Sequence, residues 1–161
     1  MNIIKSGLIL LFCFLVSTAS AGPMSSDTNI SGLKIKPSSY SVGETLDRFE
    51  TIIKKKGITV FARIDHAQGA QKAGLSLAPT ELVIFGNPTL GTPLMSSQQT
   101  AAIDLPLKAI AWQDKEGKVW LAYNLPEYIA NRHGIKDQTA VVKKMTGALN
   151  KFSDFATQKS Q

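Results

Sequence analysis

Residues 41–65, SVGETLDRFETIIKKKGITVFARID, decide the fold class of this chain. Ser41 and Glu44 have the S-x-x-E spacing of a capping box, which marks the start of a helix. Apolar residues then recur every three or four positions, as on one face of a helix, until Gly57 stops the pattern. The eight residues that follow are rich in β-branched and aromatic side chains, which favour a strand. The stretch therefore predicts a helix over 42–56 and a strand directly after it.

The predicted strand at 58–65 also carries charged side chains that are candidates for function. Strict alternation would place the even-numbered residues from Ile58 to Ile64 on one face. Arg63 and Asp65 would then share the other face, two positions apart. An ion pair or hydrogen bond along the strand is one structural explanation for these two charges.

Further strands and short helices follow on either side of this stretch. Strands are expected at 33–36, 82–85, 105–112 and 119–124. Helical segments are expected at 67–73, 90–99, between Pro126 and Gly134, and at 137–156. This order predicts an α+β fold with a β-α-β4-α arrangement, in which a largely antiparallel sheet carries its helices on one face.

The N-terminus has the three parts of a secretory signal peptide. A short basic start precedes an apolar run from Leu8 to Val16, and small residues follow for cleavage after Ala21. The run is shorter than the ~20 residues of a stable membrane span. We therefore expect a periplasmic or secreted protein with no stable span after cleavage, and a retained anchor is the alternative. The expected organisation is a signal peptide at 1–21, a polar leader with the first strand at 22–38, and a single α+β domain at 39–157.

The composition excludes several classes of protein. The 161 residues carry a formal charge of +6, with 43% hydrophobic and 19% charged residues, which is typical of a globular domain. The single cysteine, Cys13, lies in the expected signal peptide, so thiol redox chemistry and cysteine-bound zinc are excluded for the processed chain. The lysines are dispersed and do not alternate with aromatic residues, so nucleic acid is not an expected partner.

The segment from Gly86 to Thr92 has the glycine spacing of a phosphate-binding loop. Thr92 stands where that motif requires lysine, and Pro88 removes one backbone amide, so a nucleotide triphosphatase is not expected. A small anion held by amides at the start of the next helix is a weaker alternative. A tight turn that needs two glycines is the structural explanation.

Metal-binding and hydrolytic sites have little support from spacing. The two histidines, His66 and His133, form no pair with the spacing of metal ligands. A mixed metal site of Asp65, His66, Asp104 and Met95 is one alternative, although no spacing brings them together. A hydrolase that uses Asp65 and His66 as an acid–base pair is another.

A sparse pattern in the middle of the chain is more specific than these motifs. It comprises RIDHA at 63–67, LAPT at 77–80, FGNPxxGTPLM at 85–95 and IDLPL at 103–107, followed by Tyr123. These residues resemble the domain of unknown function 302 family, over about residues 40–135. The resemblance implies a single small β-α-β4-α domain, related in shape to TATA-binding-protein-like folds. It implies no activity and no cofactor.

The polar residues of this pattern are the candidate ligand-binding residues, because they lie at predicted strand ends and in loops. They are Arg63, Asp65, His66, Asn87, Thr92 and Asp104. We expect them to converge near the helix that starts after Gly91, beside Phe85 and Met95, and to bind a small polar ligand, an anion or a metal. The expected function is a binding or accessory module in the periplasm, and the expected assembly is a homodimer. A homodimeric interaction protein without a ligand is the other alternative.

Overall fold

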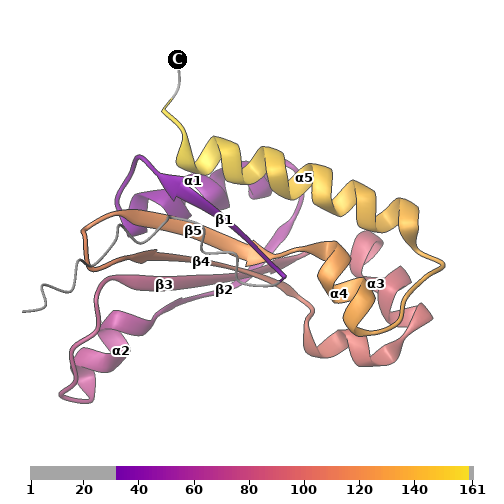
Figure 1. Cartoon of the computed structure of the whole chain (residues 1–161), viewed down its shortest axis with the longest axis horizontal. Helices are drawn as coiled ribbons and strands as arrows, with labels where there is room; N and C mark the ends of the chain where they lie inside the picture. Colours follow the sequence, from indigo (N-terminus) through magenta and orange to yellow (C-terminus); the bar gives the residue numbers. More distant parts are fainter. Residues whose placement is uncertain (1–31, 160–161) are drawn as a thin grey trace, which may run out of the picture.

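A computed structural model describes residues 32–159, so the expected signal peptide at 1–21 and most of the expected leader lie outside the described residues. The described chain folds into one five-stranded sheet with helices packed on it (Figure 1). The strands are β1 (Leu33–Ser38), β2 (Thr59–Asp65), β3 (Thr80–Gly86), β4 (Leu107–Gln113) and β5 (Val119–Asn124). The helices are α1 (Val42–Lys55), α2 (His66–Lys72), α3 (Pro88–Ser97), α4 (Pro126–Arg132) and α5 (Thr139–Thr157), with a 3-10 helix η1 (Gln99–Ile103).

Every pair of neighbouring strands is antiparallel, and the strand order is β1-β5-β4-β3-β2. The strands β1 and β2 are therefore the two opposite edges of the sheet, and α1 connects one edge to the other. Figure 1 shows α1 and α5 together over one face of the sheet. The predicted β-α-β4-α arrangement is confirmed, with the short helices inserted between its strands and before α5.

The helix α1 forms where the sequence predicts it. The hydroxyl of Ser41 accepts a hydrogen bond from the backbone N–H of Glu44 at 3.3 Å, which caps the helix start. Leu46, Phe49 and Ile53 are completely buried on its apolar face. Burying each such side chain contributes roughly 1.5–3 kcal/mol relative to exposing it. This face, together with α5, covers the sheet and forms the main core.

The edge strand β2 departs from the expected alternation. Its register with β3 shifts between Val60 and Ala62, which leaves Phe61 as the extra residue of a β-bulge. Val60 packs against the main core, and Arg63 contacts α1, so both lie on the helix-covered face. The alternation predicted over 58–65 is therefore wrong, because one inserted residue inverts the faces on its two sides.

Candidate functional site

An apolar cavity of about 200 Å³ lies between α3, α5 and the ends of β3 and β4. Its walls contain seventeen residues, and the side chains among them are apolar except for Asn87 and Thr92. The apolar side chains in the wall include Phe61, Phe85, Met95, Leu105, Met145 and Phe152. The cavity therefore offers a mainly apolar surface with two polar groups in its wall.

The cavity lies where two apolar clusters meet without filling the space between them. The main cluster contains Phe85 and Phe152, and a smaller cluster around Leu94 contains Met145. Gly86 in the wall leaves room, because a Cβ there would lie 3.4 Å from both Phe61 and Pro106. Side chains of ordinary size on both clusters thus leave a hollow at their junction.

Two of the six predicted site residues, Asn87 and Thr92, line this cavity, and both come from α3 or its cap. The side-chain oxygen of Asn87 accepts a hydrogen bond from the backbone N–H of Thr89 at 2.9 Å, which starts α3 directly after β3. Phe85 and Met95 lie beside them in the wall, as the sequence predicted. This part of the expected site is thus assembled.

Asp65 and His66 lie at the other end of the sheet, and their expected convergence with Asn87 is wrong. In the β2–β3 pair, Asp65 faces Glu81, whereas Gly86 at the cavity faces the first residue of β2. Six strand residues separate the two ends, which is about 20 Å. The carboxylate of Asp65 caps α2 instead, by accepting a hydrogen bond from the N–H of Gln68 at 2.8 Å. Antiparallel pairing explains the separation, because β2 ends where β3 begins.

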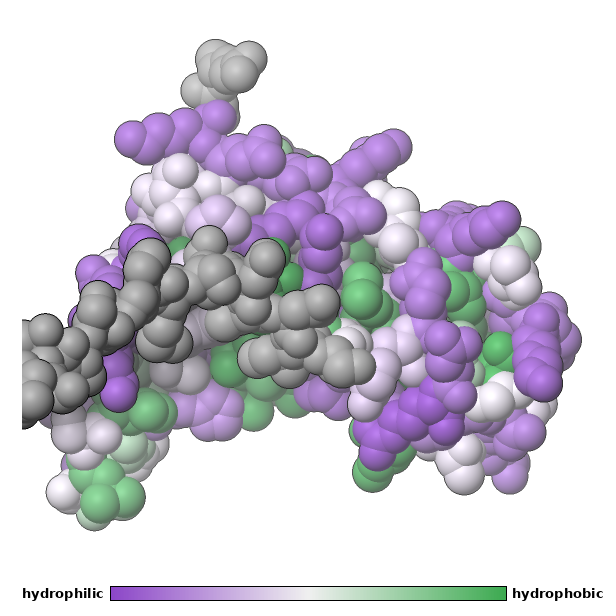
Figure 2. Space-filling view, in the orientation of Figure 1, coloured by the Kyte–Doolittle hydropathy of each residue, from purple (hydrophilic) through white to green (hydrophobic). Residues whose placement is uncertain are grey.

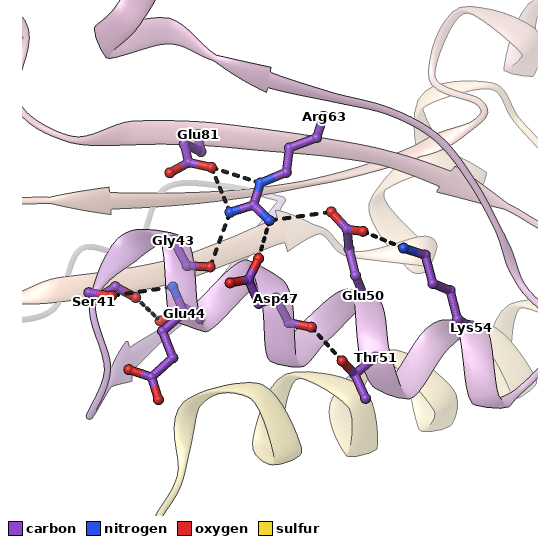
Figure 3. Close-up of polar contacts among 10 residues, drawn as sticks. Ser41, Gly43, Glu44, Asp47, Glu50, Thr51, Lys54, Arg63 and Glu81 are labelled. Atoms are coloured by element: carbon purple, nitrogen blue, oxygen red, sulfur yellow. Dashed lines mark hydrogen bonds and ion pairs between the residues drawn. The ribbon is translucent and has the colours of Figure 1, made fainter.

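Arg63 does not pair with Asp65 either, and its partners lie on α1 and β3. Its guanidinium forms ion pairs with Asp47 and Glu50 of α1 and with Glu81 of β3 (Figure 3). Burial alone would lower the pKa of the Arg63 guanidinium, but the hydrogen bonds that it donates to Asp47 and Glu81 outweigh burial and raise the pKa above its usual value. The guanidinium of Arg63, with three carboxylate partners, fastens the edge strand β2 to α1. Its hydrogen-bond donors are used within the protein rather than offered to a ligand.

Asp104 lies in a separate polar group that the sequence did not predict. Its Oδ2 lies 2.7 Å from Nε2 of His133, and its Oδ1 accepts a hydrogen bond from Nη1 of Arg132 at 3.1 Å. Nδ1 of His133 lies 3.0 Å from the hydroxyl of Thr100 in η1. The aspartate and histidine that the structure brings together are thus Asp104 and His133, rather than Asp65 and His66. No local spacing signals this contact, since 29 positions separate the two residues.

A second polar contact joins the same two segments. The hydroxyl of Ser97, at the end of α3, donates a hydrogen bond to Oδ1 of Asp137 at 2.5 Å. This bond, more than any other contact, lowers the pKa of Asp137 below its usual value. Together with the contacts of Asp104 and His133, it holds α3 and η1 against the chain between α4 and α5. Because α3 forms one wall of the cavity, we refer to these contacts as the polar latch.

Metal ligands do not gather in the part of the chain that the structure describes. Among residues 32–159 there is no group of three or more histidine, cysteine, aspartate or glutamate side chains that could hold a metal ion. The mixed metal site of Asp65, His66, Asp104 and Met95 is therefore not assembled. Within those same residues, no helix is both long and apolar enough to cross a membrane.

The fold and the cavity define a class: a two-layer α+β domain with an apolar cavity beside its sheet. The sequence identifies the family: the profile of the "Domain of unknown function DUF302" family matches residues 34–152. The chain belongs to this family, which confirms the resemblance seen in its motifs.

Relatives and a solved structure extend this comparison. The chain is 48% identical over 119 residues to proteins named "Fluoride-specific ion channel FluC 1" from Brucella suis and Brucella abortus. The match covers 73% of this chain but only 47% and 44% of those relatives, so the chain spans about half their length. A crystal structure of an uncharacterized conserved DUF302 protein from Bacillus stearothermophilus matches with a TM-score of 0.70 and 17% identity. The matched region covers 78% of this chain and 98% of the Bacillus protein. The similarity supports the two-layer α+β fold described above.

Proposed function

We propose that this domain is a binding module that holds a small, mainly apolar ligand in the cavity between α3 and α5. The observation that carries this proposal is the wall of the cavity, whose side chains are apolar except for Asn87 and Thr92. Pockets that bind small molecules typically combine such a lining with a few polar groups. The volume of about 200 Å³ is also sufficient, since a buried apolar cavity of ~150 Å³ accepts benzene.

This ligand class differs from the small polar ligand that the sequence favoured. Four of the six candidate residues lie away from the cavity, and Asn87 already uses its side-chain oxygen to cap α3. The hydroxyl of Thr92 is a polar group that a ligand can use without disturbing that cap, and the side-chain NH2 of Asn87 is a second donor. We therefore propose a ligand with an apolar body and a single polar group, such as an alcohol.

The curated relatives favour an accessory role at a membrane. Their ion-channel name belongs to chains about twice as long as the matched segment, so we do not extend channel activity to this domain. A related domain inside such a protein is consistent with a module that works close to a membrane. We propose that this chain is exported and works in the periplasm. N-terminal sequencing of the protein from a periplasmic extract should begin at Gly22, and an intact N-terminus in the cytoplasmic fraction would contradict export.

The methionines give a direct test of the cavity. Met95 and Met145 lie in its wall, whereas Met24 precedes the described domain. With [13C-methyl]methionine, addition of benzene or 1-hexanol should shift the Met95 and Met145 methyl signals in NMR spectra and leave Met24 unchanged. Filling the cavity with Ala148→Phe should abolish these shifts. The matched control is Ala140→Phe, at an exposed position of the same helix.

Two outcomes would refute the binding module. The first is an absence of shifts: if the Met95 and Met145 signals do not move with either probe at concentrations up to its solubility limit, the cavity accepts no small apolar molecule. Equal shifts in the wild type and in a folded Ala148→Phe variant would place binding elsewhere. Thr92→Val should weaken the response to 1-hexanol about tenfold and leave that to benzene unchanged, because it removes one hydrogen bond.

A further inference from the structure

The face of the sheet that points away from α1 and α5 carries a set of large apolar side chains. Leu121 on β5 is completely buried on the helix-covered face, and it pairs with Ala111 of β4. Because side chains alternate along each strand, their neighbours in both strands point to the other face. The large apolar residues on that other face include six half-buried side chains, Ile35, Leu82, Ile84, Ile110, Trp112 and Trp120. We call this surface the open face.

The size of the open face is that of an interaction site. Five strands spaced ~4.8 Å apart and about 20 Å long present roughly 400 Å² in projection. Contiguous apolar patches of roughly 300–600 Å² are the largest on typical monomers and are often functional. An antiparallel sheet with one face towards solvent usually carries polar residues there. The open face departs from that rule on β1, β3, β4 and β5.

Opposite charges lie at the two ends of β4 on the open face. Lys108 is at the start of the strand, opposite Ile84 of β3. Asp114 follows the end of the strand, where its carboxylate accepts a hydrogen bond from Nε1 of Trp120 at 2.7 Å. The two residues are each three positions from Ala111, which is therefore the midpoint between them. A second β4 that runs antiparallel across this midpoint would therefore bring each lysine to an aspartate.

We infer that a second copy of this chain covers the open face, with the two β4 strands antiparallel about a two-fold axis between Ile110 and Trp112. In this arrangement Lys108 of each copy meets Asp114 of the other, and Ile110 of each packs on Trp112 of the other. Packed sheets cross at about 30°, which displaces residues three positions from the axis by about 5 Å. A lysine side chain spans that displacement.

Exposed apolar residues beside the sheet fit the same arrangement. Leu75 and Leu77, in the loop after α2, are 69% and 48% exposed, and Ile103 of η1 is 71% exposed. The loop leads into β3 at the Asp114 end of the sheet, and η1 precedes β4 at the Lys108 end. Figure 2 shows hydrophobic surface at both ends, below the sheet as drawn. Antiparallel packing brings the leucines of one copy to the isoleucine of the other, which extends the interface towards the ~800 Å² per partner of a stable dimer.

Chemical cross-linking tests the register directly. Within one copy, Lys108 and Asp114 are six strand residues, or about 20 Å, apart, so a zero-length carbodiimide cannot join them. We expect a Lys108–Asp114 cross-link in a mixture of 15N-labelled and unlabelled chains, with peptides of mixed isotope content. Sedimentation velocity of the purified chain should show a dimer that dissociates on dilution over about a hundredfold range of concentration.

Two variants and a control complete the test. Lys108→Glu places like charges together, and should raise the dimer dissociation constant at least about tenfold. Ile110→Lys should give a folded monomer, with folding checked by circular dichroism. The control, Lys144→Glu, makes the same charge change on the exposed side of α5 and should leave the dimer intact. The inference would be overturned by a monomeric wild type or by a dimer that Lys108→Glu does not weaken. It would also be overturned by a cross-link from Lys108 to Asp27 of the same chain, because that result would show that the leader covers the open face.

Discussion

The carboxylate of Asp104 and the imidazole of His133 are joined by a contact of 2.7 Å between Oδ2 and Nε2. Both side chains are almost fully buried, at 9% and 7% exposure. The histidine also contacts the hydroxyl of Thr100, so one ring links η1 to the end of α4. This contact is the centre of the polar latch, and it keeps α3 in place as a wall of the cavity.

Removal of the imidazole tests the latch. His133→Ala leaves the buried carboxylate of Asp104 without its histidine partner, so the free energy of unfolding should fall by about 1–3 kcal/mol. Urea denaturation at neutral pH measures the change. The control is His66→Ala, because His66 is exposed at the start of α2, and its effect should stay within about 0.5 kcal/mol. Equal destabilisation by the two variants would contradict a latch at His133.

Replacement of Arg63 tests whether this residue serves the fold or a ligand. Arg63→Leu should lower the free energy of unfolding by about 1 kcal/mol, since the partly exposed ion pairs with Glu50 and Glu81 are lost. The difference should shrink at high salt, which screens charges near the surface. Thermal unfolding with added phosphate or acetate provides the contrast. Stabilisation of the wild type, but not of Arg63→Leu, by these anions would make Arg63 a ligand-binding residue instead.

Two glycines should respond in opposite ways to alanine. Gly147 lies inside α5, and a Cβ there would meet nothing within 4 Å apart from the adjacent backbone of its own helix, so Gly147→Ala should stabilise the protein by about 0.5–1 kcal/mol. Gly32 has a φ of +84°, and a Cβ there would lie 2.4 Å from the ring of Tyr128. Gly32→Ala should therefore destabilise the protein, by at least about 1 kcal/mol. Melting temperatures of both variants check the signs.

Tyr123 should limit the stability of the domain at alkaline pH. Burial raises the pKa of its hydroxyl above the usual value, and the hydroxyl lies 3.0 Å from Oδ1 of Asn150. The raised pKa means that the folded protein favours the neutral phenol. The contribution of Tyr123 to the free energy of unfolding is therefore complete below the unfolded-state pKa of about 10, and it is lost as the pH rises through the folded-state pKa. The free energy of unfolding should fall less steeply above pH ~10 in Tyr123→Phe than in the wild type. Identical slopes would contradict this role.

The sequence predicts the fold well where local rules dominate. The capping box at Ser41 and the stop at Gly57 place α1 correctly, and the inserted short helices follow their proline and glycine signals. No sequence pattern signals the bulge at Phe61, because an extra residue in an edge strand changes the faces without changing the composition. Periodicity therefore located β2 but assigned its faces wrongly.

The candidate site was predicted only in part. The motif around Asn87 and Thr92 brings these two residues to one place, the wall of the cavity, since they are local to one cap and one helix. The motif pattern groups Asp65 and His66 with the same site, yet antiparallel pairing places them at the opposite end of the sheet. The contact of Asp104 with His133 depends on the packing of η1 against α4, which no pattern in either segment encodes.

The placement of β1 at the edge beside β5 has a kinetic consequence. On a chain made from its N-terminus, β1 emerges first, but its partner β5 ends only at Asn124. The contacts that complete the sheet thus join distant parts of the chain, which slows folding compared with a helical bundle. During that delay an unpaired strand is prone to aggregation. The lysines and Pro37 in the β1 sequence LKIKPS are features that discourage such pairing, so this strand is protected until the second half of the chain arrives.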